Sequence, residues 1–105
     1  MPASPDLVFR ALADPTRRAV LERLMRGEAA VVELTGGLHV SQPAISQHLA
    51  VLREAGLVAP RQQGRHRIYR AEPAGLAPLI DWIGHHQRFW TRSLDKLKST
   101  LEALK

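Results

Sequence analysis

In the middle of the chain, apolar residues recur at helical spacing, and the polar residues between them form a second face. Ile45, Leu49 and Leu52 are four and three positions apart, which places them on one side of a helix. Ser41 stands where an N-cap residue is expected, and Gly56 stands where a glycine commonly ends a helix. We therefore predict a helix here with one face buried against the rest of the domain.

The outer face of this helix carries side chains that donate hydrogen bonds. Gln42, Ser46 and Gln47 lie off the apolar stripe, and glutamine can bind adenine through its N6 and N7 atoms. A helix anchored on one side and rich in donors on the other is suited to the major groove of DNA. We predict base contacts from these three residues. Backbone contacts are predicted from the remaining polar residues of the helix, which are Ser41, His48 and Arg53.

The chain is predicted to begin with two short helices. The first covers residues 6–13, and the second begins at Pro15 with Asp14 as its N-cap, because proline at the first helical position needs no amide hydrogen bond. The second helix runs to about Arg26, and Gly27 ends it. Its arginines are expected on a solvated face, with the first two also placed to touch a phosphate. These residues are Arg17, Arg18, Arg23 and Arg26.

Residues 28–38 are predicted as a further short helix with a buried apolar side. Gly36 and Gly37 near its end each cost roughly 1 kcal/mol of helix stability relative to alanine, so the helix either ends early or opens into a looser turn. A tight turn over residues 39–41 then leads into the donor-rich helix, which is the helix-turn-helix arrangement. The apolar residues expected to be buried are Val31, Val32, Leu34 and Leu38.

After Gly56 the pattern changes to that of strands. Residues 57–59 and 68–70 are predicted as two short strands joined by a basic turn around Gly64. Residues 53–70 hold five arginines against one glutamate, so this segment alone carries a charge of +4. We predict a cationic hairpin, the wing, that contacts the DNA backbone or minor groove; the alternative is a merely polar hairpin tip. The predicted contacts are Arg65, His66, Arg67 and Tyr69.

The last part of the chain, residues 76–104, is predicted as one helix of roughly 42 Å at 1.5 Å per residue. Its apolar residues keep a seven-, four- and three-residue spacing that is typical of a helix pair. A domain of 105 residues cannot cover such a helix on all sides. We therefore predict that it pairs with a second copy of the chain, in addition to packing against its own first helix. The predicted interface residues are Trp82, Ile83, Phe89, Trp90, Leu94, Leu97 and Leu101.

Composition narrows the function classes further. The net charge is +5 and 12 of the 15 basic residues are arginine, which favours nucleic acid over anionic membranes as a partner. The chain has no cysteine, which excludes disulfides and thiolate metal ligands. It has neither a signal peptide nor an apolar run long enough for a membrane span. We expect a single cytoplasmic domain with no membrane partner.

No group of residues predicts catalysis. Ser46 and His48 are two positions apart on a helix and do not face each other, so we predict no enzyme and no cofactor. Asp81, His85 and His86 resemble part of a metal site, since Asp81 and His85 share a helical face. No further histidine follows them, which favours surface or interface polar residues over a metal site.

Residues 9–18, 41–58 and 64–69 together resemble the ArsR/SmtB family of bacterial repressors. The resemblance covers nearly the whole chain. It implies a mainly α (α+β) winged helix-turn-helix domain with about five helices and a two-stranded β-hairpin wing. It also implies a homodimer held by the first and last helices, including Leu7. Such a dimer represses its own or a neighbouring operon, with double-stranded operator DNA as its partner and an inducer that the residues do not identify.

Two departures from the family pattern limit this expectation. Metal-sensing members carry two cysteines in the helix before the turn, where this chain has Ala30 and Val32. Asp81 and His85 match only half of the site that other members use at the last helix. We predict a repressor that does not sense metal. The alternatives are a metal-responsive repressor using Asp81, His85 and His86, and a protein-interaction module that uses the long helix.

Overall fold

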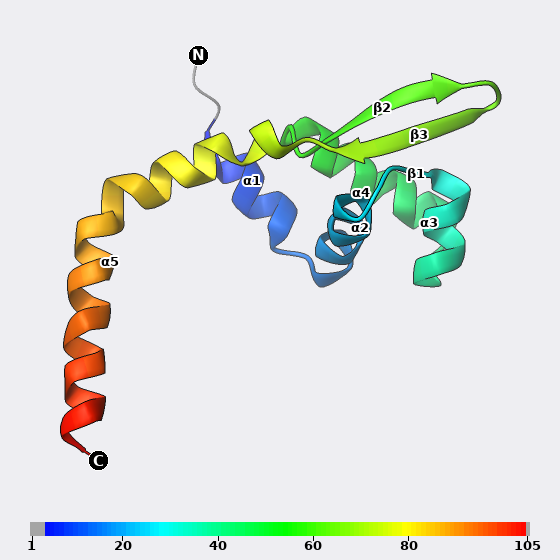
Figure 1. Ribbon diagram of the computed structural model, residues 1–105. Helices are drawn as coiled ribbons and strands as arrows, with labels where there is room; N and C mark the ends of the chain where they lie inside the picture. The colour runs from blue at the N-terminus through cyan, green and yellow to red at the C-terminus, as the bar shows by residue number, and fades with distance from the viewer. Residues whose placement is uncertain (1–3, 105) are drawn as a thin grey trace.

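Five α-helices and a three-stranded antiparallel sheet make up the computed structural model, which describes residues 4–104 (Figure 1). A 3₁₀ helix, η1, precedes the last α-helix. The elements in chain order are α1 (Pro5–Leu12), α2 (Pro15–Met25), β1 (Ala29–Ala30), α3 (Val31–Leu38), α4 (Gln42–Glu54), β2 (Val58–Gln63), β3 (His66–Ala71), η1 (Pro73–Leu76) and α5 (Ala77–Ala103). The predicted helix-turn-helix followed by a β-hairpin is therefore confirmed.

Three of the helices begin with the same local device, a polar N-cap followed by a proline in the first turn. The Ser4 hydroxyl accepts a hydrogen bond from the Asp6 amide (3.1 Å), and the Asp14 carboxylate accepts one from the Arg17 amide (2.8 Å). The Ser41 hydroxyl accepts one from the Ala44 amide (3.3 Å), which confirms its predicted role as an N-cap. These caps satisfy amides that have no partner inside the helix.

The wing is longer than predicted, and it gains a third strand. β2 and β3 pair from Val58 with Ala71 to Gln63 with His66, so that Gly64 and Arg65 form a two-residue turn. Gly64 has a φ of 61°, the left-handed conformation that such hairpin turns require. β1 pairs with β3 on its other side. We predicted these two residues as the start of the helix over 28–38, which instead begins at Val31, because two residues are too few to show a strand periodicity.

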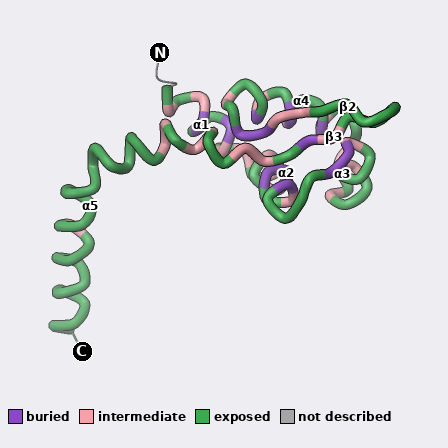
Figure 2. Tube along the Cα trace, turned by 45° about the horizontal axis from the view of Figure 1, so that its top comes forward, coloured by how far each residue is buried: buried purple, intermediate pink, exposed green. Residues whose placement is uncertain are grey.

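The core lies between α2, α3, α4 and the sheet, as the buried segments in Figure 2 show. The predicted apolar stripe of α4 is confirmed, with Ile45, Leu49 and Leu52 each no more than 1% exposed. The other core residues from the helices and the sheet are Val8, Ala11, Val20, Leu21, Leu24, Ala29, Leu34, Leu57, Val58 and Tyr69. α4 is thus anchored along its whole inner face, which leaves its outer face free.

α3 differs from the prediction in two respects. It continues through Gly36 and Gly37 to Leu38, so neither glycine ends it, and His39 terminates it in the left-handed conformation with a φ of 55°. Histidine is among the residues that tolerate this conformation. Val32, predicted to be buried, is 64% exposed. Leu34 is the one residue of this helix that is buried.

α5 packs on α1 only near its start, where the ring of Phe9 meets that of Trp82 edge-on with 5.4 Å between centroids. Figure 1 shows that α5 bends midway, so its C-terminal half points away from the other elements. None of its 27 residues is buried. Despite its length, neither this helix nor any other within residues 4–104 is apolar enough to cross a membrane.

Candidate nucleic-acid interface

The outer face of α4 is open along its length. The predicted base-contact residues, Gln42, Ser46 and Gln47, are all exposed, as are Ser41 and Arg53. Each of these side chains stays exposed because the opposite stripe of the helix is held in the core. α4 therefore presents a row of uncharged hydrogen-bonding groups with an arginine towards its C-terminal end.

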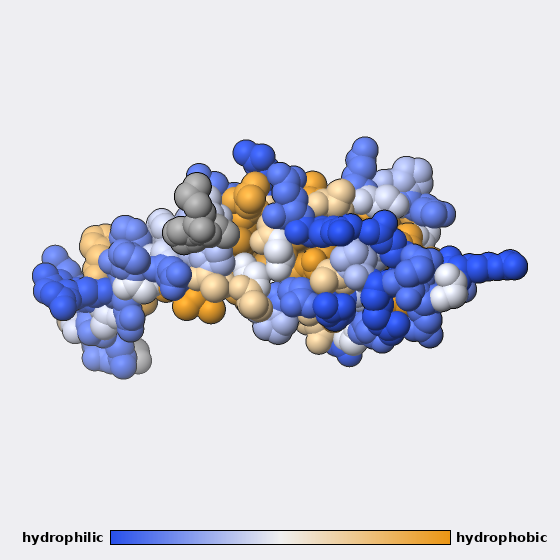
Figure 3. Space-filling model, turned by 90° about the horizontal axis from the view of Figure 1, so that it is seen from above, coloured by the Kyte–Doolittle hydropathy of each residue, from blue (hydrophilic) through white to orange (hydrophobic). Residues whose placement is uncertain are grey.

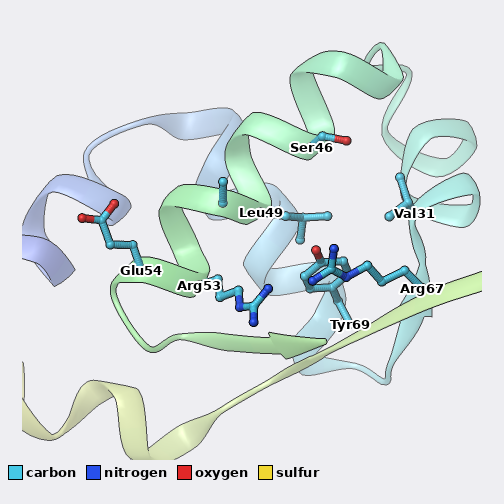
Figure 4. Close-up of a pocket in the computed structure, with 8 residues that line it drawn as sticks. Val31, Ser46, Leu49, Arg53, Glu54, Arg67 and Tyr69 are labelled. Carbon is cyan, nitrogen blue, oxygen red and sulfur yellow. The ribbon is translucent and has the colours of Figure 1, made fainter. Parts of the chain in front are cut away.

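A cleft of about 550 Å³ separates the C-terminal half of α4 from the wing. Figure 4 shows the side chain of Arg53, from α4, directed towards that of Arg67, from β3, whose guanidinium group lies over the ring of Tyr69. The carboxylate of Glu54 is directed away from both (Figure 4). Two positively charged side chains therefore line this cleft, and neither forms an ion pair within residues 4–104.

A second cleft of about 320 Å³ continues from the first towards the wing tip. Gln42 and Ser46 of α4 lie on one side of it, and Arg65, His66 and Arg67 of the wing lie on the other. The chain thus brings together the residues predicted to contact bases and those predicted to contact the backbone. Seen from above, the end of the molecule that the wing forms is covered by hydrophilic side chains (Figure 3).

The five arginines of residues 53–70 fall into two groups that the sequence did not distinguish. Arg61 forms an ion pair with Glu28, with 2.5 Å between Nη2 and Oε1, and Arg70 forms one with Glu72 at 2.7 Å. Hydrogen bonding by Arg61 holds the pKa of the Glu28 carboxyl below its usual value, and the same contact raises the pKa of Arg61. These two arginines are already neutralised by the chain itself.

The second group has no carboxylate partner within residues 4–104. It consists of Arg53, Arg65 and Arg67, which surround the two clefts. The remaining positive charge of the predicted cationic segment is therefore concentrated where α4 and the wing face each other. An arginine fork of this kind suits phosphate oxygens, which accept two hydrogen bonds from one guanidinium group.

Tyr69 requires a correction. We predicted it among the exposed contacts of the wing, but it is only 7% exposed and belongs to the core, opposite Ala29 of β1. Its ring lies beneath the guanidinium group of Arg67, with 5.6 Å from Cζ to the centroid, a cation–π contact. Tyr69 therefore supports Arg67, and its ring does not extend from the surface.

His48 and Arg17 form a contact that the sequence patterns missed. His48, predicted to touch the DNA backbone, is half-buried, and its Nδ1 atom lies 3.4 Å from Nη1 of Arg17. The solvated face predicted for the arginines of α2 is wrong for Arg17, whose guanidinium group also donates to two carbonyl oxygens of α1. No periodicity could have indicated a contact between positions 31 residues apart.

The two histidines considered for a metal site have other partners. The Nδ1 atom of His85 lies 2.8 Å from the backbone carbonyl oxygen of Asp81, one turn earlier. The ring of His86 packs against that of Trp82, with centroids 4.6 Å apart. Within residues 4–104, no three histidine, aspartate or glutamate side chains lie close enough together to hold a metal ion.

Comparison with known proteins relates this arrangement to one family. Residues 14–59 match the family described as "Bacterial regulatory protein, arsR family". The chain is 53% identical over 91 residues to the HTH-type transcriptional regulator Rv2034 of Mycobacterium tuberculosis, which is 87% of this chain and 82% of that protein. It is 49% identical over 71 residues to the arsenic resistance transcriptional regulator ArsR1 of Pseudomonas putida, spanning 67% of this chain and 56% of that protein.

A solved structure gives the same result for the fold. The ArsR-like transcriptional regulator from Rhodococcus sp. RHA1 superposes with a TM-score of 0.73 at 35% sequence identity. The match covers 90% of both chains. The likeness thus extends from the helix-turn-helix through the wing into the last helix.

Proposed function

Because this chain belongs to the arsR family of bacterial regulatory proteins, we propose that it is a homodimeric repressor that binds the operator of its own or a neighbouring operon. The chain is a transcriptional regulator and not an enzyme. The observation that carries the proposal is the pair of clefts between α4 and the wing, where unpaired arginines face the exposed amides and hydroxyls of α4.

In the proposed complex, α4 lies in the major groove. Gln42, Ser46 and Gln47 contact base edges, since an amide or a hydroxyl can both donate to and accept from the bases. The wing follows the neighbouring backbone, where its unpaired arginines neutralise phosphates or enter the minor groove. Ser41, His48 and Arg53 add backbone contacts, and the wing supplies Arg65, His66 and Arg67.

The proposed dimer follows from the long apolar surface of α5. Its large apolar side chains, from Ile80 to Leu104, are between 39% and 78% exposed in one chain. An apolar surface that extends along most of a 27-residue helix is a common mark of a subunit interface. The proposed interface joins Leu7 of α1 to a seam on α5 formed by Trp82, Ile83, Phe89, Trp90, Leu94, Leu97 and Leu101.

The dimer has a direct test in solution. Leu97→Glu places two carboxylates inside the seam, one from each chain, and should convert the dimer into a monomer because buried like charges are strongly unfavourable. Ser99→Glu adds the same charge two positions further along and outside the leucine spacing, so it serves as the matched control. Sedimentation velocity distinguishes the two states, and a dimer that persists in Leu97→Glu contradicts the proposed seam.

Operator binding is tested with the DNA upstream of the gene that encodes this chain. A fluorescent duplex of that region should bind tightly at about 0.15 M salt, and a scrambled duplex of the same composition should bind on the order of a thousand-fold more weakly. Equal affinity for both duplexes contradicts the proposal. Affinity that is lost for both duplexes alike as the salt concentration rises also contradicts the proposal, because such binding is purely electrostatic.

A further inference from the structure

Arg17 lies where three helices meet, and its side chain makes hydrogen bonds in three directions. Its Nε atom donates to the carbonyl oxygen of Ala11 (2.7 Å), and Nη2 donates to that of Arg10 (3.1 Å). Its Nη1 atom lies 3.4 Å from Nδ1 of His48 on α4. One side chain of α2 thus joins the C-terminal end of α1 to the helix proposed to read DNA.

We propose that Arg17 is a positioning residue for operator binding, acting through His48. By occupying Nδ1, Arg17 holds the imidazole with its proton on Nε2, so that His48 offers this N–H group to a DNA phosphate. The inference rests on the proposed function and extends it, since Arg17 itself touches no DNA in this account.

The chemistry of the two groups determines the tautomer. A guanidinium group is always protonated and has donors only, so the ring nitrogen that faces it must accept. A neutral imidazole carries a single N–H group, and its proton is therefore on Nε2 when Nδ1 accepts. Without Arg17 both tautomers are available, and only one of them presents a donor at Nε2.

The same side chain couples α4 to the helices proposed to form the dimer. The Arg10 and Ala11 carbonyls belong to the last turn of α1, and that of Arg10 also accepts a hydrogen bond from the Ala13 amide (3.3 Å). α1 in turn contacts α5 through Phe9 and Trp82. Contacts therefore run from α5 through α1 and Arg17 to His48, so the position of α4 depends on the two helices that are proposed to form the dimer.

Arg18 supplies a matched control, because a lysine there keeps the positive charge with which Arg18 was predicted to touch a phosphate. Its Nη1 atom donates to the carbonyl oxygen of Leu12 at 2.6 Å, so it also caps α1, but no hydrogen bond or ion pair joins its side chain to α4 within residues 4–104. Arg17→Lys and Arg18→Lys both keep the positive charge and remove a guanidinium cap. Only the first removes the fork that also reaches His48, because a lysine ammonium group has no planar arrangement of five donors.

The decisive experiment measures operator affinity and its salt dependence for folded, dimeric variants. Arg17→Lys frees both the tautomer and the orientation of the ring. Release of the tautomer alone costs about two-fold in affinity, because about half of the molecules then carry the proton on Nε2, and loss of the His48–phosphate hydrogen bond raises the loss to about ten-fold. Arg18→Lys should change affinity less than about two-fold. The slope of log affinity against log salt should remain that of the wild type, since no charged phosphate contact is lost. Equal losses in the two variants, or a slope lowered by Arg17→Lys alone, overturn the proposal.

A second cycle separates positioning from simple capping of α1. His48→Gln keeps an N–H donor close to the position of Nε2 and removes the ring tautomers, so Arg17→Lys should have little further effect in that background. Additive losses overturn the proposal, because coupled residues show non-additive effects.

The tautomer itself can be measured without DNA. Long-range ¹H–¹⁵N spectra of the five histidines, with His48 assigned through His48→Gln, should show the Nε2–H form in the wild type and a mixture in Arg17→Lys. An Nδ1–H form in the wild type contradicts the inference even where operator binding is selective. If the wild type shows no selective binding, the proposed function is contradicted instead, so the two failures are distinguishable.

Discussion

Replacing the unpaired arginines of the wing tests whether local contacts or net charge attract DNA. In Arg65→Gln with Arg67→Gln, each chain loses two charges that have no carboxylate partner within the described residues. In Arg61→Gln with Arg70→Gln, each chain also loses two charges, but both were paired with Glu28 and Glu72. The two variants have the same net charge and differ only in which arginines remain.

The expected magnitude follows from counting phosphates. Each neutralised phosphate contributes about 0.9 to the slope of log affinity against log salt, so the four contacts of a dimer contribute about 3.6. A four-fold rise from 50 to 200 mM salt then costs the wild type about 150-fold more affinity than it costs Arg65→Gln with Arg67→Gln. The variant that lacks the paired arginines should keep a slope within about 1 of the wild-type value.

Fluorescence anisotropy with one labelled operator duplex at five or six salt concentrations gives the three slopes. Circular dichroism and sedimentation establish that each variant is folded and dimeric before titration. Equal slopes for the two double variants would refute the reasoning, because net charge alone would then account for binding. A slope lowered only in the variant without Arg61 and Arg70 would show that these two arginines contact the phosphates, and not Arg65 and Arg67.

Further predictions concern the platform that holds the site. Leu49→Ala should lower the free energy of unfolding by about 2–5 kcal/mol, measured by urea denaturation, because Leu49 is 1% exposed. Gly37→Ala should raise it by about 0.4–1 kcal/mol, since a Cβ there meets nothing and φ is ordinary; Gly56→Ala, with a φ of 78°, should lower it. The hydrogen bond from the Arg17 amide lowers the pKa of Asp14 from 3.8, so its stabilising contribution is complete above that pH and is lost as pH falls through the lowered value. Asp14→Asn should therefore show a shallower loss of stability below about pH 4 in acid titrations, and an unchanged profile would contradict this assignment.

Local signals were sufficient to predict most of the helices. The spacing of Ile45, Leu49 and Leu52 requires one buried face, and Ser41 and Asp14 each cap a helix that has proline in its first turn. These features lie within one or two turns of the residues that they organise. The sequence therefore predicted α4, its outer face and its boundaries without knowledge of the rest of the fold.

Features that depend on distant partners were not predictable in this way. β1 exists only through its pairing with β3, where Ala29 and Ala30 lie opposite Tyr69 and Ile68, about 40 positions later in the chain. The same contact explains why Tyr69 is buried and not exposed on the wing. Gly37 remains helical because helix propensity is a weak preference that tertiary packing overrides.

The candidate site was predicted by residue type but not by charge balance. Arg61 and Arg67 look alike in the sequence, yet only Arg61 has Glu28 beside it, 33 positions earlier in the chain. Likewise, nothing near Arg17 in the sequence indicates His48. Ion pairs and hydrogen bonds between separate elements can be identified only once the fold is known. These contacts determine which arginine side chains remain free to bind DNA in the proposed complex.

Hydroxyl-radical footprinting of the upstream DNA tests the central claim most directly. If two copies of α4 read one operator, the protein should protect two segments related by an approximate two-fold axis and separated by about 10 bp or a whole multiple of it. Gln42→Ala with Gln47→Ala should abolish this selective protection. Uniform protection along the duplex, or a pattern that the double variant leaves unchanged, would contradict the claim that α4 reads the operator.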